Sequence, residues 1–311
     1  MRLAIPARFR EYLGQLPAEL EVSWYADAAD CPGAVAQAEV LWLAFGLQAE
    51  ILTVLAAGPR LRLVFTPGAG MDRQPLHEYR ERGITLVNGA GLAAVPIAEY
   101  TVMAMLAAAK GLPELIRAQD RGEWLKKPPG RRELLGTRAL ILGFGNIGRA
   151  LGQRLEGFGV EVTGVRRRPD GEAGVIGPEA WRPRLAEFDW VVIAAPPTVE
   201  TARLIGAAEL SAMKAGAWLL NISRGTLVDQ PALVSALAEG GLGGAYLDVT
   251  DPEPLPPESE LWKLPNVIVT PHSSWASDHF SQRSAELFME TVARYRAGRE
   301  LRNVVDLLAG Y

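Results

Sequence analysis

The sequence predicts an α/β protein with two doubly wound parallel sheets, each covered by helices on both faces. Short, wholly apolar runs alternate with segments of helical periodicity, and such apolar strands are typical of parallel sheets. Most of the runs end in glycine-rich turns. The chain has 311 residues, of which 49% are hydrophobic and 22% charged, so it is long enough for two domains with cores of their own.

The first hundred residues contain one series of these elements. The runs at residues 38–45, 61–70 and 84–91 predict strands. Between them, "QAEILTVLAAG" and "PLHEYRERG" predict helices that are each closed by a glycine. We expect this series to form a small α/β unit.

A second series follows a helical pattern that begins at about Ala98, "AEYTVMAMLAAAKGLPELIRAQDRGEW". Its predicted strands are "RALILG", "VEVTGV", "DWVVIAAPP", "AWLLNIS", "GAYLDV" and "NVIVTPH". The end of the chain is helical in pattern and contributes no strand, so we expect it to pack on the first unit. The predicted domains are therefore a discontinuous one, residues 1–97 and 276–311, and a continuous one, residues 98–275.

Composition excludes several classes of function. The net charge of −4 gives no sign of a nucleic-acid or membrane-surface binder. Cys31 is the single cysteine, which excludes an internal disulfide and a cysteine-based zinc site, and we predict no metal. The N-terminus has no signal-peptide core, and the apolar runs are about half as long as a membrane span. We expect a cytoplasmic protein with no nucleic-acid or membrane partner.

The stretch "GFGNIG" has the G-x-G-x-x-G spacing between a predicted strand and an amphipathic helix. Gly143 permits the tight turn, Gly145 a close approach to a pyrophosphate, and Gly148 close packing of helix on strand. The helix N-terminus directs N–H groups and its positive dipole end at phosphates. The sequence therefore predicts a dinucleotide site. Its predicted contacts are Gly143, Gly145, Asn146, Ile147, Gly148 and, after a later strand, Pro196.

The stretch "GVRRRPD" indicates which dinucleotide is bound. It lies about twenty residues after the glycines, where NAD-binding units place a carboxylate on the adenosine ribose. Arg166 and Arg167 occupy that place instead, and guanidinium groups match a phosphate. We predict NADP as the cofactor, with NAD possible. The alternative interpretation is a solvated basic loop.

Three later strand ends carry polar groups: Arg224 in "NISRGTLVD", Asp248 and Glu253 in "LDVTDPEPLP", and His272 in "TPHSSWAS". Ligands bind outside the carboxyl edge of such sheets, so these groups are expected to converge. Together they suit reduction of a 2-keto acid, because Arg binds the carboxylate, His supplies the proton and Glu holds the imidazole. Taken singly, each is also consistent with an ordinary surface or strand-end residue.

These segments and the glycine turn resemble, in order, the signatures of the D-isomer-specific 2-hydroxyacid dehydrogenases, in particular the glyoxylate/hydroxypyruvate reductase type. The resemblance runs from "FTPGAG" to "PHSS". It implies a Rossmann cofactor domain inserted into a flavodoxin-like substrate domain, with the active site in the cleft between them. It also implies catalytic roles for Arg224, Glu253 and His272 and a nicotinamide-orienting role for Asp248. The implied substrate-binding residues are Gly68, Ala69 and Gly70, through their backbone N–H groups, with Arg224 and His272.

Two positions depart from the family pattern. Ser273 replaces the usual apolar residue after the histidine, and Trp275 either walls the substrate pocket or packs the interdomain hinge. The early loop "AFGLQAE" (residues 44–50), expected to face the substrate, contains no Arg or Lys.

The family commonly dimerises through the region that here spans residues 98–135, which implies a homodimer.

Three hypotheses follow. The first is an NADPH-dependent reductase that converts a small 2-keto acid to the D-2-hydroxy acid. The second is an NAD-dependent, phosphoglycerate-type dehydrogenase, against which the arginine cluster and the uncharged early loop argue. The third is a non-catalytic, dinucleotide-sensing protein, against which the set Arg224, Glu253 and His272 argues. The sequence leaves open which 2-keto acid is used and in which direction the reaction runs.

Overall fold

A computed structural model describes residues 1–310 of the chain, which divides into two compact units. Unit 1 consists of Met1–Ala93 and Ser277–Tyr311, and unit 2 is Ala94–Ala276. These divisions lie a few residues from the predicted domain boundaries. At the boundary between Ala93 and Ala94, a helix begins at Ala94 rather than at about Ala98. Pro96 is compatible with this earlier start, since it lies in the first turn, where a backbone N–H has no helical partner.

Unit 1 contains a five-stranded parallel sheet of order β2-β1-β3-β4-β5, the order of flavodoxin-like folds. Its strands are β1 (Arg2–Pro6), β2 (Glu21–Tyr25), β3 (Val40–Trp42), β4 (Leu63–Thr66) and β5 (Thr85–Asn88). The sequence did not predict β1 or β2. The apolar run of β1 is cut short by Pro6, and β2 is an edge strand with mostly exposed or half-buried side chains, so neither has the pattern of a central strand.

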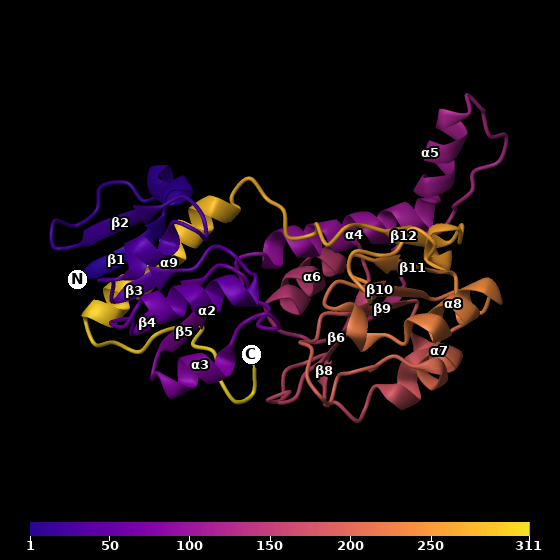
Figure 1. Cartoon of the computed structure of the whole chain (residues 1–311). Coiled ribbons are helices and arrows are strands. Elements are labelled where there is room, and N and C mark those ends of the chain that lie inside the picture. The colour runs from indigo at the N-terminus through magenta and orange to yellow at the C-terminus, as the bar shows by residue number, and fades with distance from the viewer. Residues whose placement is uncertain (311) are drawn as a thin grey trace. The chain divides into compact units, whose positions relative to one another are not determined.

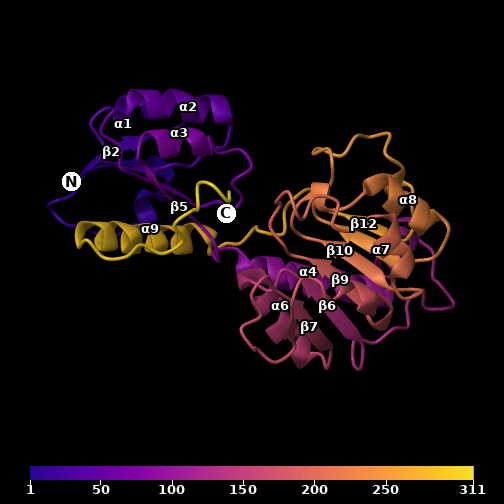
Figure 2. The same ribbon diagram turned by 90° about the horizontal axis from the view of Figure 1, so that it is seen from below.

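Helices cover both faces of this sheet. They are η1 (Ala7–Tyr12), α1 (Cys31–Val35), α2 (Gln48–Ala57), α3 (Leu76–Glu81) and α9 (Phe280–Arg296). Figure 2 shows α1, α2 and α3 on one face and the C-terminal helix α9 on the other. An aromatic cluster holds α9 there: the ring of Trp42 lies 4.7 Å from that of Phe288, 5.4 Å from Phe65 and 4.2 Å from Phe9. These contacts hold the end of the chain on unit 1.

Unit 2 contains a seven-stranded parallel sheet of order β12-β11-β10-β9-β6-β7-β8. Its strands are β6 (Arg138–Leu142), β7 (Glu161–Val165), β8 (Val175–Ile176), β9 (Trp190–Ile193), β10 (Trp218–Asn221), β11 (Gly244–Leu247) and β12 (Val267–Val269). The order reverses between β6 and β9, which is the ligand-binding switch point of Rossmann sheets. The predicted fold class, two parallel-sheet α/β domains, is confirmed.

The helices of unit 2 also lie on both faces of their sheet. They are α4 (Ala94–Lys110), α5 (Leu112–Asp120), α6 (Asn146–Gly157), α7 (Ala207–Ala212) and α8 (Gln230–Ala238), with short 3-10 turns η2 (Arg182–Glu187), η3 (Gly225–Leu227) and η4 (Glu260–Trp262). Figures 1 and 2 show α4 and α6 together on one side and α7 and α8 on the other. The carboxyl edge of the sheet carries the turns that follow β6, β9, β10 and β11.

The helical pattern expected from about residue 98 forms two helices, α4 and α5. The chain bends by 71° between α4 and α5. Gly111 adopts a left-handed conformation (φ 63°) at the bend, and Pro113 lies in the first turn of α5, so the helical hydrogen-bond ladder restarts there. Within residues 1–310, no single helix has both the length and the composition to cross a membrane; α4 and α5 reach them only when counted together across this bend.

We predict that Phe288→Ala lowers the free energy of unfolding by about 3–5 kcal/mol, because it leaves a cavity at a fully buried position against the rings of Trp42 and Phe65. The matched control is Phe158→Ala. Phe158 is 42% exposed, so we expect its loss to cost about 1 kcal/mol or less. Urea unfolding followed by circular dichroism measures both, and equal losses for the two variants would contradict the aromatic anchor.

Candidate active site

The glycine-rich turn after β6 lies at the switch point of the unit 2 sheet. Gly143 has a φ of 101°, and a Cβ added to it would lie 2.4 Å from the backbone nitrogen of Ala195, in the turn after β9. A Cβ on Gly148 would lie 2.5 Å from the carbonyl oxygen of Gly143. Both positions therefore admit glycine alone. A Cβ on Gly145 would meet no atom within 4 Å, so this side of the turn is open.

This turn fits the diphosphate of a nicotinamide dinucleotide. Helix α6 begins at Asn146, and no side chain caps its N-terminus, so its first N–H groups point outward. Gly145 and Asn146 are exposed, and Ile147 is half-buried. The exposed Pro196 follows Ala195 in the adjacent turn, which the Thr201 hydroxyl fixes by donating to the carbonyl of Pro196 at 2.7 Å. The predicted cofactor residues of these two turns thus lie at one sheet edge.

Arg166 follows β7 directly, and its backbone N–H donates to the carbonyl of Ile176 at 3.0 Å. Its side chain is 40% exposed, with Nη1 lying 3.8 Å from Asp170 Oδ2 and 4.0 Å from Glu172 Oε2. Both separations exceed hydrogen-bond length, so the guanidinium is loosely held. Arg167 is exposed in the same loop.

Sequence reasoning missed the arginine and carboxylate beside this loop. Arg149 of α6 binds Glu172 through its two terminal guanidinium nitrogens, Nη1 and Nη2, with Nη2 lying 2.6 Å from Oε2. These hydrogen bonds hold the pKa of Glu172 below its usual range. The only signal was the position of Arg149 one turn into the helix that follows the glycines, and nothing in the sequence paired it with Glu172.

Arg224 occupies the turn after β10. The buried Asn221, last in the strand, donates from Nδ2 to the carbonyl of Arg224 at 2.8 Å and accepts from the N–H of Ser223 at 3.1 Å. The Ser223 hydroxyl donates to the carbonyl of Ala195, which ties this turn to the cofactor turn. Backbone and side-chain bonds thus fix where the half-buried Arg224 side chain begins.

Gly225 brings the Arg224 turn onto the segment that carries Glu253. A Cβ on Gly225 would lie 2.0 Å from the carbonyl carbon of Thr250, so the two backbones touch. The N–H of Thr250 points at Glu253 Oε1, at 3.4 Å. The turns after β10 and β11 are therefore packed together, and the positions of Arg224 and Glu253 are coupled through backbone contact.

His272 and Glu253 form a pair. His272 Nδ1 lies 3.0 Å from Glu253 Oε2, and the two side chains are 40% and 30% exposed. With Nδ1 directed at the carboxylate, Nε2 is the ring nitrogen available to exchange a proton with a ligand. His272 has a positive φ of 50°, which is uncommon for a residue other than glycine.

Asp248 differs from the other acidic residue of the site. It is 1% exposed, and its carboxylate accepts hydrogen bonds from Thr270 Oγ1 at 2.7 Å and from the N–H groups of Ser273 at 3.0 Å and Ser274 at 3.2 Å. The expectation that it orients a nicotinamide stays a prediction. What the structure adds is that its partners all belong to the segment around His272.

Trp275 was expected either to wall the substrate pocket or to pack a hinge. Its side chain is 46% exposed, and its indole N–H donates to the carbonyl of His272 at 3.0 Å. The indole therefore supports the backbone of the histidine. Ser273, which departs from the family pattern, lies with its hydroxyl 3.4 Å from that of Tyr100 on α4.

In unit 1, Gly68, Ala69 and Gly70 form an exposed turn after β4. The carbonyls of Gly68 and Ala69 accept from Gly89 N at 3.2 Å and from Asn88 Nδ2 at 3.3 Å, which fixes the turn. A rigid glycine turn that exposes its backbone is suited to binding a carboxylate.

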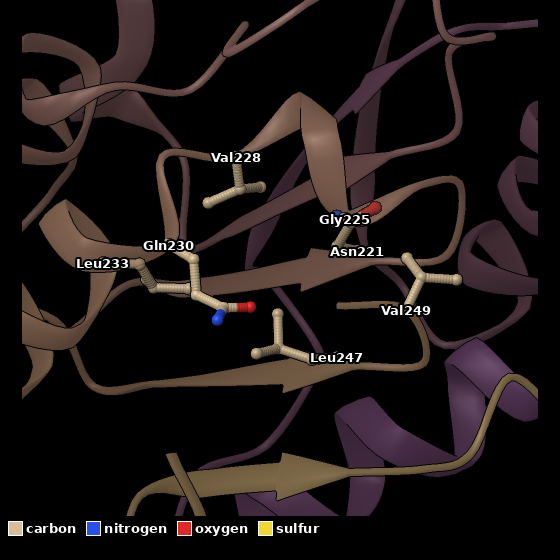
Figure 3. A pocket seen from close by; sticks show the side chains of 7 residues that line it. All are labelled: Asn221, Gly225, Val228, Gln230, Leu233, Leu247 and Val249. Carbon is tan, nitrogen blue, oxygen red and sulfur yellow. The ribbon is translucent and has the colours of Figure 1, made fainter. Parts of the chain in front are cut away.

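A small pocket lies beside Gly225, as Figure 3 shows. It is lined by Asn221, Gly225, Val228, Gln230, Leu233, Leu247 and Val249. Its one polar side chain that reaches the Glu253 segment is Gln230, whose Oε1 accepts from the N–H of Asp251 at 3.3 Å. We interpret it as support for the two turns. Residues 1–310 contain no group of three or more His, Cys, Asp or Glu side chains that could hold a metal ion.

Known proteins resemble this chain over most of its length. Residues 102–274, more than half of the chain, match the family model "D-isomer specific 2-hydroxyacid dehydrogenase, NAD binding domain". The glyoxylate reductase of Korarchaeum cryptofilum is 35% identical over 81% of this chain and 78% of its own length. The D-3-phosphoglycerate dehydrogenase of Methanocaldococcus jannaschii is 30% identical over 82% of this chain but only 49% of its own length.

Among solved structures, the NADPH-dependent glyoxylate/hydroxypyruvate reductase of Sinorhizobium meliloti, in complex with NADP and malonate, superposes with a TM-score of 0.80. It is 27% identical, and the match covers 99% of this chain and 98% of that one. The sheet orders, the glycine turn and these matches agree. The chain therefore belongs to the D-isomer specific 2-hydroxyacid dehydrogenases, NAD(P)-dependent oxidoreductases that act on small 2-keto and 2-hydroxy acids.

Proposed function

We propose that the protein uses NADPH to reduce a small, unphosphorylated 2-keto acid, such as glyoxylate or hydroxypyruvate, to the D-2-hydroxy acid. The observation that carries the proposal is the pair His272–Glu253, 3.0 Å apart, beside a turn fixed around Arg224. An imidazole held by a carboxylate is suited to donate a proton, and the adjacent guanidinium to bind a carboxylate. Relatives described as glyoxylate reductases support the substrate class.

When bound, the nicotinamide supplies the hydride that reduces C2 of the keto acid. The protein's own residues bind the substrate and supply the proton. Arg224 binds the substrate carboxylate and polarises the carbonyl. Protonated His272 gives the proton on Nε2 to the carbonyl oxygen, which becomes the hydroxyl. Glu253 holds Nδ1 and so fixes the direction in which Nε2 points.

The preference for NADPH rests on the residue after β7. A carboxylate there would bind the ribose hydroxyls of NADH and repel a 2′-phosphate, but the chain has Arg166. Because the nearest carboxylates lie 3.8 and 4.0 Å away, beyond hydrogen-bond length, a phosphate dianion can displace them from the guanidinium. The Sinorhizobium meliloti reductase, described as NADPH-dependent, supports the same choice.

The proposed substrates carry no phosphate. Residues 44–50 and 66–71, the loops expected to face the far end of the substrate, contain no Arg or Lys. A phosphorylated keto acid would bring about two further negative charges, which need a dedicated cation. The D-3-phosphoglycerate dehydrogenases of Methanocaldococcus jannaschii and Archaeoglobus fulgidus support the alternative, an NAD-dependent phosphoglycerate-type dehydrogenase, but this chain spans about half of each.

We also propose that the protein forms a homodimer through α5 and the segment after it. Leu115 and Ile116 of α5 are 40% and 49% exposed, and Trp124 is 93% exposed. Figure 1 shows α5 projecting away from the sheet of unit 2. Apolar side chains gathered on one projecting segment are typical of an interface between subunits.

The first test is a comparison of kcat/KM for glyoxylate, hydroxypyruvate and 3-phosphohydroxypyruvate, each with NADPH and with NADH. We expect the unphosphorylated acids with NADPH to give the highest values. Loss of one paired phosphate contact should lower kcat/KM with NADH about ten- to a hundredfold. A higher value for the phosphorylated acid would favour the phosphoglycerate-type alternative.

The cofactor part of this prediction has a matched pair of variants. Arg166→Asp is expected to move the preference toward NADH, because it restores a ribose-binding carboxylate and removes the phosphate ligand. Arg168→Asp makes the same charge change two residues later, at an exposed position, and is expected to alter the ratio far less. Equal shifts in the two variants would show that net charge alone sets the ratio.

His272→Gln is expected to lower kcat by about 10²–10⁴, the range typical of a lost general acid, while leaving nicotinamide fluorescence titrations of cofactor binding unchanged. Arg224→Ala is expected to raise KM for the keto acid and to lower kcat together, because binding and polarisation are both lost. Near-normal turnover by His272→Gln on the best substrate would remove the proposed proton donor.

Trp124→Glu is expected to convert the dimer to a monomer, because it places a charge among side chains that the interface buries. Sedimentation equilibrium measures the mass. The control is Leu308→Glu, which changes another exposed apolar residue (80% exposed) in unit 1 and should leave the mass unaltered. A wild-type protein that is already monomeric at micromolar concentration would refute the dimer.

A further inference from the structure

We propose that Asn303, in the segment that follows α9, is a positioning residue for the carboxylate of the substrate. It acts on the turn Gly68–Gly70, whose backbone N–H groups bind that carboxylate according to the family resemblance. Asn303 and this turn both belong to unit 1. The proposal rests on the proposed function, because it takes a 2-keto acid as the substrate. Nothing in the local sequence connects Asn303 with the glycine turn.

The direction of the N–H groups in this turn is set by the carbonyls that precede them. The carbonyl of Gly68 accepts from the N–H of Gly89 at 3.2 Å, and that of Ala69 accepts from Asn88 Nδ2 at 3.3 Å. In a planar trans peptide the C=O and the following N–H point in opposite directions. The two hydrogen bonds therefore direct the N–H groups of Ala69 and Gly70 away from their partner segment. In the part of the chain that the structure describes, neither N–H has an acceptor, so both are available to an anion.

The Asn88 side chain is itself fixed by a neighbouring residue, Ala90. The carboxamide accepts from the N–H of Ala90 at 3.0 Å through Oδ1, while its Nδ2 is the donor to Ala69. Asn88 is 7% exposed, so its carboxamide has little access to water. The residue between them is packed on the same turn, since a Cβ on Gly89 would lie 2.0 Å from the carbonyl oxygen of Pro67. A displacement of Ala90 would therefore turn the carboxamide and, with it, the peptide planes of the glycine turn.

Asn303 fixes the position of Ala90. Its Nδ2 donates to the carbonyl of Ala90 at 2.9 Å, and its own carbonyl accepts from the N–H of Asn88 at 3.0 Å. Ala90 is thus bound through its N–H by one asparagine and through its carbonyl by the other. The hydrogen bonds run from Asn303 through Ala90 and Asn88 to the carbonyl of Ala69, and we call these four residues the asparagine network.

The segment that carries Asn303 is anchored to the edge of the unit 1 sheet. The N–H of Val305 donates to the carbonyl of Leu86 on β5 at 2.9 Å, and Val304 forms an antiparallel bridge with Val87. The Val305 side chain is 4% exposed and belongs to the core of the unit. Figure 2 shows the end of the chain beside β5. Asn303 therefore starts from a fixed backbone, as a positioning residue must.

The backbone conformation of Asn303 allows its side-chain hydrogen bond to be tested by itself. Its φ of 55° lies in the left-handed region, which asparagine, aspartate and glycine adopt more readily than other residues. Asn303→Gly keeps this conformation and removes the donor to Ala90. Asn303→Asp keeps the size of the side chain but places an oxygen against the Ala90 carbonyl. Both changes leave the anchoring by Val305 in place.

The experiment compares these variants with Asn88→Asp and with a control, Val305→Ala. Asn88→Asp removes the donor to Ala69 directly. Val305→Ala loosens the same segment but removes no hydrogen bond of the asparagine network. KM and kcat are measured with saturating NADPH and the best 2-keto acid substrate of the wild-type protein. Oxalate, a dicarboxylate without a keto group, gives a competitive inhibition constant that does not depend on turnover.

We expect KM for the keto acid and the inhibition constant of oxalate to rise together, about three- to tenfold, in both Asn303 variants, the effect of one hydrogen bond. kcat and the dissociation constant of NADPH stay within about twofold of wild type, because the lost interaction binds ground state and transition state equally. Val305→Ala lowers the melting temperature, since it leaves a cavity, but keeps KM within about twofold of wild type. The double variant of Asn88→Asp with Asn303→Gly stays within about twofold of Asn88→Asp, because both changes break one network.

Three results would overturn the proposal. An unchanged KM in the Asn303 variants would show that the asparagine network does not reach the substrate. An equal rise of KM in Val305→Ala would show that general loosening is the cause, and effects that multiply in the double variant would show that Asn303 does not act through Asn88. Thermal melts precede the kinetics, and Asn303→Gly alone decides if Asn303→Asp does not fold. Failure of the proposed function is recognised separately, because the wild-type protein would then reduce no 2-keto acid with either cofactor.

Discussion

Backbone-to-backbone contact at the carboxyl edge of the unit 2 sheet is the constraint on which the site depends. Gly143 lies against the turn after β9, and Gly225 lies against the segment after β11, each at a distance that leaves no space for a Cβ. Because these contacts are made by main-chain atoms, they fix the turns before any side chain is considered. The contacts of these two glycines therefore determine where the side chains on those turns begin, above all that of Arg224.

Two acidic residues, Glu253 and Asp248, contact His272 and its loop in different ways. Glu253 is partly exposed and faces the ring, so it determines which nitrogen is left for a ligand. Asp248 is buried and accepts hydrogen bonds from the N–H groups of Ser273 and Ser274, which follow the histidine. A carboxylate at the surface can exchange partners with water, whereas a buried one cannot without a large cost. One carboxylate thus faces the histidine ring from a partly exposed position, and the other faces the histidine's loop from a buried position.

The sequence predicted those parts of the molecule that depend on local pattern. Apolar runs located nearly all the strands of unit 2, and the glycine spacing located the turn after β6, because both are set by neighbouring residues. The edge strand β2 was missed, since its pattern is not apolar, and the bend at Gly111 was missed, since a helical composition continues through it. The pairing of Arg149 with Glu172 and the partners of Asp248 join residues distant in the chain, and only the tertiary structure contains that information.

The aromatic cluster under α9 has a consequence for synthesis on the ribosome. Trp42 and Phe65 are translated before unit 2, but the ring of Phe288 that covers them is translated after it. Unit 2 is encoded without interruption between them and has every strand of its own sheet before α9 exists. Domains usually fold in the order in which they are made. Here the order is reversed: the N-terminal part of unit 1 is translated before unit 2 but is enclosed after it, and its bare sheet face is the surface that a chaperone would have to shield.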